Sequence, residues 1–166
     1  MKSNPPLELS YGLATCQFGN VVIAFADNCV HYLSFCIIIA NAYDEIRALF
    51  PSTKLSMDET KTKLLTDIIF SKNEPIAVCP HGTPFQIAVW TALQNIPKGT
   101  TVSYSQIAHE IGKPNAVRAV AKAIGSNNIA FLIPCHRVIS KNGGLAGFKW
   151  GLELKKQLLL WETNNL

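Results

Sequence analysis

The 166-residue sequence lacks any long hydrophobic run, and its longest apolar stretch, around Phe35 to Ala40, is far too short to cross a membrane. The start, MKSNPPLELS, lacks the basic and then apolar pattern of a secretory signal. Repeats and low-complexity tracts are also missing, and 48% hydrophobic with 16% charged residues is typical of a globular protein. We therefore expect a cytoplasmic protein with one or two domains.

A disulfide framework is lacking too. The cysteines are five, an odd number, at irregular spacing: Cys16, Cys29, Cys36, Cys79 and Cys135. We therefore expect no disulfide in a chain without an export signal. Cys29 with His31, and Cys79 with His81, offer zinc ligands, but neither pair shows the spacing of a structural site. We assign no metal and no cofactor.

Acidic residues are scarce in the second half of the chain. Residues 83–166 carry nine Lys/Arg against three Asp/Glu, whereas residues 1–82 carry six against eight. A basic half favours a phosphate-bearing partner, although a solvated surface with excess lysine explains the charge equally well.

The first half predicts an antiparallel sheet with helices packed on it. Strands are expected at 7–16, 20–26 and 29–38, with a turn at Asp27-Asn28. A helix follows at 42–50, and a second begins with a capping box from Ser56 to Glu59. Residues 71–82 are rich in helix breakers and suggest a linker, so we place an α+β structural domain at 1–80.

The second half, 81–166, is predicted to be mainly helical. Thr83 and Ser103 each begin a capping box, and a last helix covers 152–161 with Glu162 at its end. Two short helices joined by Gly-Lys-Pro form a helix-turn-helix pattern. The second of them exposes a polar face that suits either DNA or solvent: Asn115, Arg118, Ala119 and Lys122.

The segment IPCHRVI, residues 133–139, places a thiol, an imidazole and a guanidinium between apolar pairs. Cys135 is either a small buried side chain or a nucleophile. Ionising a thiol completely gains only about ten- to thirtyfold near neutral pH, so a large acceleration requires positioning of the electrophile and protonation of its leaving group. A nucleophilic Cys135 therefore predicts a pocket lined by polar donors.

Four segments in this order, GTPFQIAVW, IPKGTTVSYSQIAHEIGKPNAVRAVAKAIGSNN, IPCHRVI and GLAGFKWG, resemble the O6-alkylguanine-DNA alkyltransferases, especially the bacterial type. The resemblance covers residues 82–162 and is looser before them. It implies an α+β fold with a ribonuclease-H-like N-terminal domain and a winged-helix-like C-terminal domain. It also implies irreversible transfer of an alkyl group from O6 of guanine to the protein, one lesion per molecule, with O4 of thymine as a further candidate.

The resemblance implies roles for five side chains at the reacting centre. Cys135 would accept the alkyl group, and His136 would take the thiol proton through a water. Glu162 would orient His136, and Asn127 would brace the site. Tyr104 would bind the guanine and help to protonate it as it leaves.

The resemblance also implies how a monomer would hold double-stranded DNA. The second helix would enter the minor groove, where Ala116 and Ala119 allow close approach, and Arg118 would fill the gap left by the flipped nucleotide. We add Ser103, Asn115 and Lys122 to the DNA contacts.

Around the flipped guanine, the resemblance implies that the main-chain carbonyls of Cys135 and Val138 accept its amino group. Phe148 and Lys149 belong to the lid of the pocket. Phe148 stands where many members have Tyr, so stacking is retained and the phenolic hydrogen bond is lost. The zinc site of vertebrate members does not carry over, because Pro75 stands where a ligand His is expected.

Three other functions stay open from the sequence. One is a lesion-binding protein without transfer, which the presence of Cys135 disfavours. A second is a DNA-binding regulator whose cysteine senses alkylating or oxidising agents, and the third is a Cys-His hydrolase.

Overall fold

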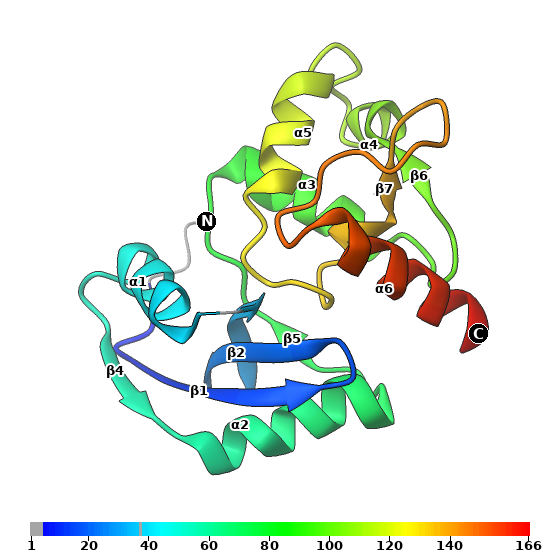
Figure 1. Cartoon of the computed structure of the whole chain (residues 1–166). Coiled ribbons are helices and arrows are strands. Elements are labelled where there is room, and N and C mark those ends of the chain that lie inside the picture. Colours follow the sequence, from blue (N-terminus) through cyan, green and yellow to red (C-terminus); the bar gives the residue numbers. More distant parts are fainter. Residues whose placement is uncertain (1–4, 37) are drawn as a thin grey trace. The chain divides into compact units, whose positions relative to one another are not determined.

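The computed structural model describes residues 5–36 and 38–166 and divides the chain into two compact units (Figure 1). Unit 1 comprises Met1–His81 together with Asn128–Leu132, and unit 2 comprises Gly82–Asn127 together with Ile133–Leu166. The chain therefore returns to unit 1 for five residues, Asn128–Leu132, directly before IPCHRVI. The fold class is α+β, as the sequence predicts.

Unit 1 is built on a five-stranded sheet in the order β4-β1-β2-β3-β5. The three predicted strands, β1 (Glu8–Cys16), β2 (Gly19–Ala26) and β3 (Cys29–Phe35), form an antiparallel meander. Asp27 and Asn28 make the predicted turn, both with positive φ. Two edge strands that the sequence did not reveal, β4 (Lys54–Met57) and β5 (Ala77–Val78), pair in parallel with β1 and β3.

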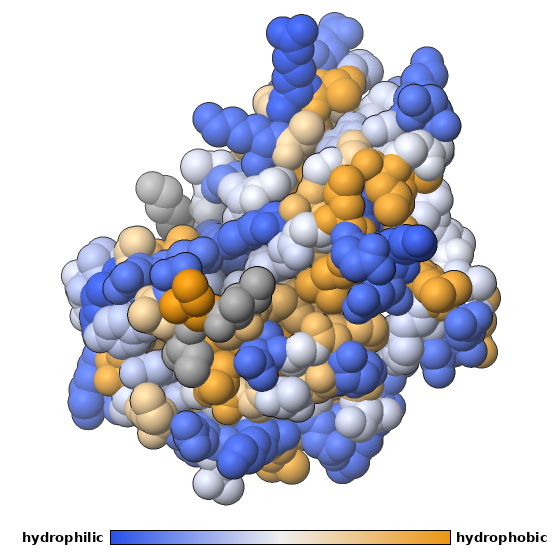
Figure 2. All heavy atoms as spheres, in the orientation of Figure 1, coloured by the Kyte–Doolittle hydropathy of each residue, from blue (hydrophilic) through white to orange (hydrophobic). Residues whose placement is uncertain are grey.

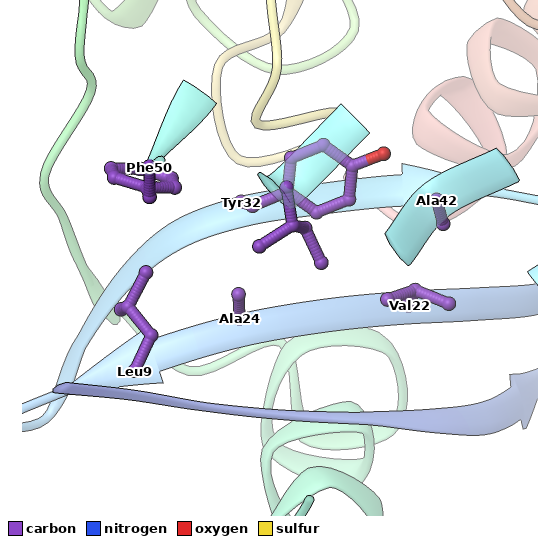
Figure 3. Close-up of a cluster of buried hydrophobic side chains, with 7 residues drawn as sticks. Leu9, Val22, Ala24, Tyr32, Ala42 and Phe50 are labelled. Atoms are coloured by element: carbon purple, nitrogen blue, oxygen red, sulfur yellow. The ribbon is translucent and has the colours of Figure 1, made fainter. Parts of the chain in front are cut away.

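Two helices cover opposite faces of this sheet, because alternate residues of β1 point to opposite sides. Leu9 packs with α1 (Ile39–Leu49) in the buried cluster of Figure 3, whereas Gly12 leaves space for Thr62 of α2 (Glu59–Thr66). The helix continues as a wider turn over Asp67–Lys72. The capping box predicted from Ser56 to Glu59 is wrong. Ser56 lies within strand β4, and the side chain of Asp58 caps α2 by accepting a hydrogen bond from Lys61 N–H at 2.9 Å.

Aromatic packing holds the returning segment Asn128–Leu132 within unit 1. The ring of Phe131 lies 4.8 Å from that of Phe70 and 6.2 Å from that of Phe18. Leu33 N–H donates to the Asn128 carbonyl, and the Leu33 carbonyl accepts from Ala130 N–H. Phe131 adopts a φ of 66°, which is costly for a bulky residue, so this packing stabilises an unfavourable backbone conformation.

The expectation of no disulfide is wrong for one pair, because Cys29 and Cys79 are joined. Pairing of β3 with β5 places their Cα atoms 6.0 Å apart, and short-range sequence spacing could not show this long-range pairing. Cys16, Cys36 and Cys135 are free thiols.

Unit 2 packs four helices around a two-stranded parallel pair. The helices are α3 (Pro84–Gln94), α4 (Tyr104–Glu110), α5 (Val117–Gly125) and α6 (Leu152–Asn164). The strands are β6 (Val102–Ser103) and β7 (Val138–Ile139). Both predicted capping boxes are confirmed, at Thr83 and Ser103. The indole N–H of Trp90 donates to the Ala123 carbonyl at 2.9 Å, which ties α3 to α5.

The face in Figure 2 carries hydrophilic side chains with smaller hydrophobic areas between them. Large apolar side chains that stay exposed are scattered along the sequence, at Leu7, Met57 and Leu64 in unit 1 and at Leu152 and Leu160 in unit 2. Among the described residues, no helix is both long enough and apolar enough to span a membrane.

Candidate functional site

Cys135 lies in a single 3₁₀ turn, Cys135–Arg137, that follows Pro134 and leads directly into β7. The side chains of Cys135 and His136 are both buried, with 4% and 0% exposure. On a strand, adjacent side chains would point to opposite faces, whereas successive residues of a 3₁₀ helix are only about 120° apart. The turn therefore removes the main objection to a neighbouring thiol and imidazole acting together.

Asn127 fixes the position of the thiol from the end of α5. Its side-chain N–H donates to Sγ of Cys135 at 3.2 Å and to the carbonyl of Ile133 at 3.0 Å. The side chain is 1% exposed, so these bonds are shielded from water. One amide thus holds both the thiol and the backbone just before it.

Glu162 is the buried carboxylate that joins the last helix to the turn. Its Oε1 lies 2.7 Å from Nε2 of His136, and both side chains are almost fully buried. Arg137 donates Nε–H to both carboxylate oxygens, at 3.1 and 3.0 Å, and Nη2–H to Oε1 at 2.8 Å. The carboxylate therefore restrains two consecutive residues after Cys135.

The loop after α3 completes the surroundings of this carboxylate. Gly99 N–H donates to Oε2 of Glu162 at 3.2 Å, and Nη1 of Arg137 donates to the Ile96 carbonyl at 2.5 Å. Gly99 has a φ of 74°, and a Cβ there would lie 2.6 Å from a methyl of Leu166. Glycine is therefore needed at this position both for the backbone and for the packing.

Lys155 is a second buried charged residue on α6, with 0% exposure. Its Nζ donates to the carbonyls of Val138 and Ala146, at 2.6 and 2.8 Å. The lysine thus links the strand after the turn to the loop that carries Phe148 and Lys149.

The protonation states follow from burial and from these bonds. Burial raises the pKa of the Cys135 thiol to about 11, although the Asn127 bond and the Lys155 charge oppose the rise. Burial also lowers the pKa of His136, so the imidazole is neutral near pH 7. Burial acts to raise the pKa of Glu162, but hydrogen bonds from His136 and Arg137 outweigh it and bring the pKa to about 2.

The carboxylate is thus ionised, and the neutral imidazole donates its Nε2 proton to it. This leaves Nδ1 of His136 as the basic nitrogen. Burial and the nearby Cys135 raise the pKa of Tyr104, so its phenol keeps its proton and can donate it. A buried thiol, a neutral base and a protonated phenol form a set suited to attack on a carbon whose leaving group needs a proton.

The other residues predicted for the site lie on α4, α5 and the loop before α6. Arg118, Asn115, Ala119 and Lys122 are exposed, while Ala116 is half-buried at the start of α5. Ser103 is engaged as the N-cap of α4 and also lies 2.9 Å from the hydroxyl of Ser105. Phe148 packs against Trp150 with ring centroids 5.3 Å apart, and the ammonium of Lys149 lies 5.3 Å from the Trp150 ring.

Sequence reasoning assigned no role to Arg137 or Lys155, which the structure places at the centre of the site. The apolar residues Leu154, Leu158 and Trp161 are spaced to share one face of the last helix, yet the buried residues of this helix are Lys155, Leu158 and Glu162. The i, i+3, i+7 spacing of this second set was the available signal.

Glu162→Gln tests how much the buried charge of this carboxylate contributes to the free energy of unfolding. At pH 7 we expect a loss of about 3 kcal/mol in the free energy of unfolding, because the Arg137 guanidinium loses its charged partner. The ionised carboxylate stabilises the wild type above the ordinary pKa of 4.5, and this gain is lost as the pH falls toward the folded-state value of about 2. Urea unfolding should therefore show the difference between the two proteins shrinking from pH 4.5 to pH 2.

Glu153→Gln is the matched control, because Glu153 is an exposed carboxylate in the first turn of the same helix. The free energy of unfolding of this variant should depend on pH as that of the wild type does. Parallel loss of stability in the wild type and in Glu162→Gln below pH 4.5 would contradict the assignment.

Known proteins resemble this chain in sequence and in fold. Residues 84–164 match the family model described as "6-O-methylguanine DNA methyltransferase, DNA binding domain". The bifunctional transcriptional activator/DNA repair enzyme Ada of Escherichia coli is 38% identical over 96% of this chain. The chain spans only about half, 47%, of that relative's length, and 48% of the regulatory protein ada of Salmonella typhimurium.

Two further relatives are matched over most of their own length. The inducible methylated-DNA–protein-cysteine methyltransferase of Bacillus subtilis is 45% identical over 73% of this chain and 71% of its own length. The crystal structure of Mycobacterium tuberculosis OGT in complex with DNA superposes with a TM-score of 0.77 at 30% identity, over 93% of each chain. The chain therefore belongs to the methylated-DNA–protein-cysteine methyltransferase family, and the resemblance noted in its motifs is confirmed.

Proposed function

We propose that this chain repairs DNA by moving a methyl or other alkyl group from O6 of guanine to Cys135 in a single turnover. The observation that carries the proposal is the buried thiol of Cys135, held by Asn127 beside an imidazole that Glu162 orients. The names of the relatives, which describe transfer from methylated DNA to a protein cysteine, support it. O4 of thymine is a second candidate substrate atom.

The proton must leave the thiol during the reaction and not before it. A pKa of about 11 leaves roughly one thiol in ten thousand ionised at pH 7. We infer that Nδ1 of neutral His136 takes the proton through a water as Sγ forms its bond to the alkyl carbon. The bond from that carbon to O6 breaks, and the electron pair stays on guanine.

The departing guanine needs a proton, and we infer that Tyr104 supplies it. The phenol is half-buried at the start of α4 and stays protonated because burial raises its pKa. The proton that His136 received returns to the phenol, so the net products are a thioether at Cys135 and unmodified guanine. No cofactor is required by this balance.

The base would be read by backbone carbonyls of the turn and by the loop before α6. The Cys135 carbonyl accepts from Val138 N–H, and the Val138 carbonyl accepts from Lys155. Each carbonyl oxygen retains a second lone pair for the guanine amino group. Phe148 would stack on the base, and Lys149 beside it would form part of the lid of the pocket.

The helix pair α4 and α5 supplies the DNA contacts in this proposal. O6 of guanine lies inside the duplex, so the nucleotide must be flipped out, and Arg118 would fill its place in the stack. Ala116 and Ala119 would let α5 approach the minor groove closely, and Ser103, Asn115 and Lys122 would contact the backbone. The solved complex of the M. tuberculosis relative with DNA supports DNA as the partner.

The unit boundaries support a division of labour between a structural N-terminal domain at 1–80 and a C-terminal domain at 81–166 that binds DNA and accepts the alkyl group. We assign a ribonuclease-H-like topology to the first and a winged-helix-like one to the second. The protein would act as a cytoplasmic monomer.

Cys135→Ala tests the acceptor directly. After incubation with a duplex containing one O6-methylguanine, intact and peptide mass spectrometry should show one methyl increment per wild-type molecule, confined to the peptide with Cys135. The variant should bind the duplex and show no increment. Cys36→Ala, which removes a free thiol of unit 1, should behave as the wild type. An increment elsewhere, or several per molecule, would contradict the proposal, and binding without any increment would make the protein a lesion sensor.

Arg118→Ala separates flipping from chemistry. Transfer from methylated duplex should slow by at least about tenfold, because an unfilled stack favours return of the base, while reaction with free O6-benzylguanine should be unchanged. Both rates are measured in single turnover. Lys141→Ala, which removes an exposed cation from the loop after β7, is the control for lost charge. Equal slowing of Arg118→Ala on both substrates would rule out this role.

A further inference from the structure

A cluster of two cysteines and two histidines lies in unit 1, apart from every residue of the proposed transfer. Ligand atoms of Cys29, His31 and Cys79 all lie within 4.8 Å of one another. Nδ1 of His31 is 3.1 Å from Nε2 of His81, and the two rings stack with centroids 5.3 Å apart. Three ligand atoms thus form one compact group, and His81 brings a fourth metal-binding side chain next to it through its contact with His31.

Strand pairing explains why residues 50 positions apart meet. β3 and β5 are parallel neighbours, with Cys29 opposite Ala77 and Val30 opposite Val78. The pairing continues past β5, because Cys79 N–H donates to the Val30 carbonyl at 2.8 Å. Cys29 with His31, and Cys79 with His81, are both i, i+2 pairs, so each pair points to one side of its extended segment.

The chemistry of the four groups fits a zinc-type ion. Zn²⁺ is bound tetrahedrally by thiolate sulfur and neutral imidazole nitrogen, and two thiolates would balance its charge. Phe50 closes one side, with its ring 4.8 Å from that of His81 and only 1% exposed.

We propose that the chain with Cys29 and Cys79 reduced binds one Zn²⁺ through these two cysteines, His31 and His81. The disulfide in the structure and the ion are alternative uses of the same two sulfurs. Binding releases the two thiol protons and requires the sulfurs to sit about 3.8 Å apart, given Zn–S bonds of about 2.3 Å in a tetrahedron.

This site differs from the sequence-based assignment of no metal, which considered the two pairs separately. The ion would fasten the last residues of unit 1, just before Gly82, to strand β3, which also holds them through the two residues of β5 and the Cys79 N–H. We therefore expect it to stabilise unit 1, because binding to the folded chain alone shifts the unfolding equilibrium.

Cobalt is the probe for this site, because tetrahedral Co²⁺ with thiolate ligands absorbs in the visible and near ultraviolet. The full chain, reduced and free of oxygen, is titrated with Co²⁺ and then with Zn²⁺. We expect one equivalent of Co²⁺ with thiolate-to-cobalt charge transfer and tetrahedral bands, displaced by one equivalent of Zn²⁺. Iodoacetamide should then modify Cys16 and Cys36 but spare Cys29 and Cys79, and removal of zinc should lower the Tm.

Matched variants locate the ligands. Cys79→Ser and His81→Ala change partly exposed residues, so both should fold, and each should weaken Co²⁺ binding by about a hundredfold or more. Cys36→Ser and Cys135→Ala should leave it unchanged. The proposal is overturned if the reduced chain, with all five thiols titratable, takes up no Co²⁺, or if Cys79→Ser and His81→Ala bind it as the wild type does. Metal content is independent of alkyl transfer, so failure here would leave the proposed function intact.

Discussion

The buried carboxylate of Glu162 is the constraint on which the site depends. It receives two donors from Arg137, contacts the imidazole of His136, and accepts the N–H of Gly99, so one group joins α6, the 3₁₀ turn and the loop after α3. A buried ion is expensive unless its hydrogen bonds are complete, and here they nearly are. Losing Arg137 would leave the charge of this carboxylate uncompensated inside unit 2. The geometry around Cys135 is therefore maintained by an interaction that the fold cannot easily rearrange.

The same arrangement resolves the apparent contradiction of a buried nucleophile with a raised pKa. A thiol that is un-ionised at rest is protected from adventitious oxidation and from free alkylating agents, because the thiolate is the reactive form. The proposed reaction then requires a base that is already neutral and correctly oriented, and burial and the Glu162 carboxylate would provide this at His136. In the proposed single-turnover transfer, such restraint would keep Cys135 unreacted until a substrate brings an electrophile into line with its sulfur.

Local patterns allowed much of this to be predicted from the sequence, and long-range pairing accounts for most of what was missed. The meander, the two capping boxes of unit 2 and the helix pair follow from alternation, caps and breakers, all of which act over a few residues. The edge strands β4 and β5 are four and two residues long and exist only because β1 and β3 offer free edges. The Cys29–Cys79 contact depends on β5, so the sequence analysis, which did not predict β5, did not predict this contact either. Lys155 was overlooked because the buried face of a helix is normally predicted from its apolar residues, and a buried lysine among leucines is an exception to that pattern.

The pH dependence of transfer tests the central claim that His136 removes the thiol proton during the reaction. Single-turnover methyl transfer from an O6-methylguanine duplex is measured from pH 7 to pH 9. Neutral His136 is present throughout this range, because its pKa is lowered, so the rate should change by less than about threefold. A thiolate formed beforehand from a thiol of pKa about 11 would instead require a rise of roughly a hundredfold over the same two units. That rise would contradict the account and leave Glu162 and His136 with a structural role only.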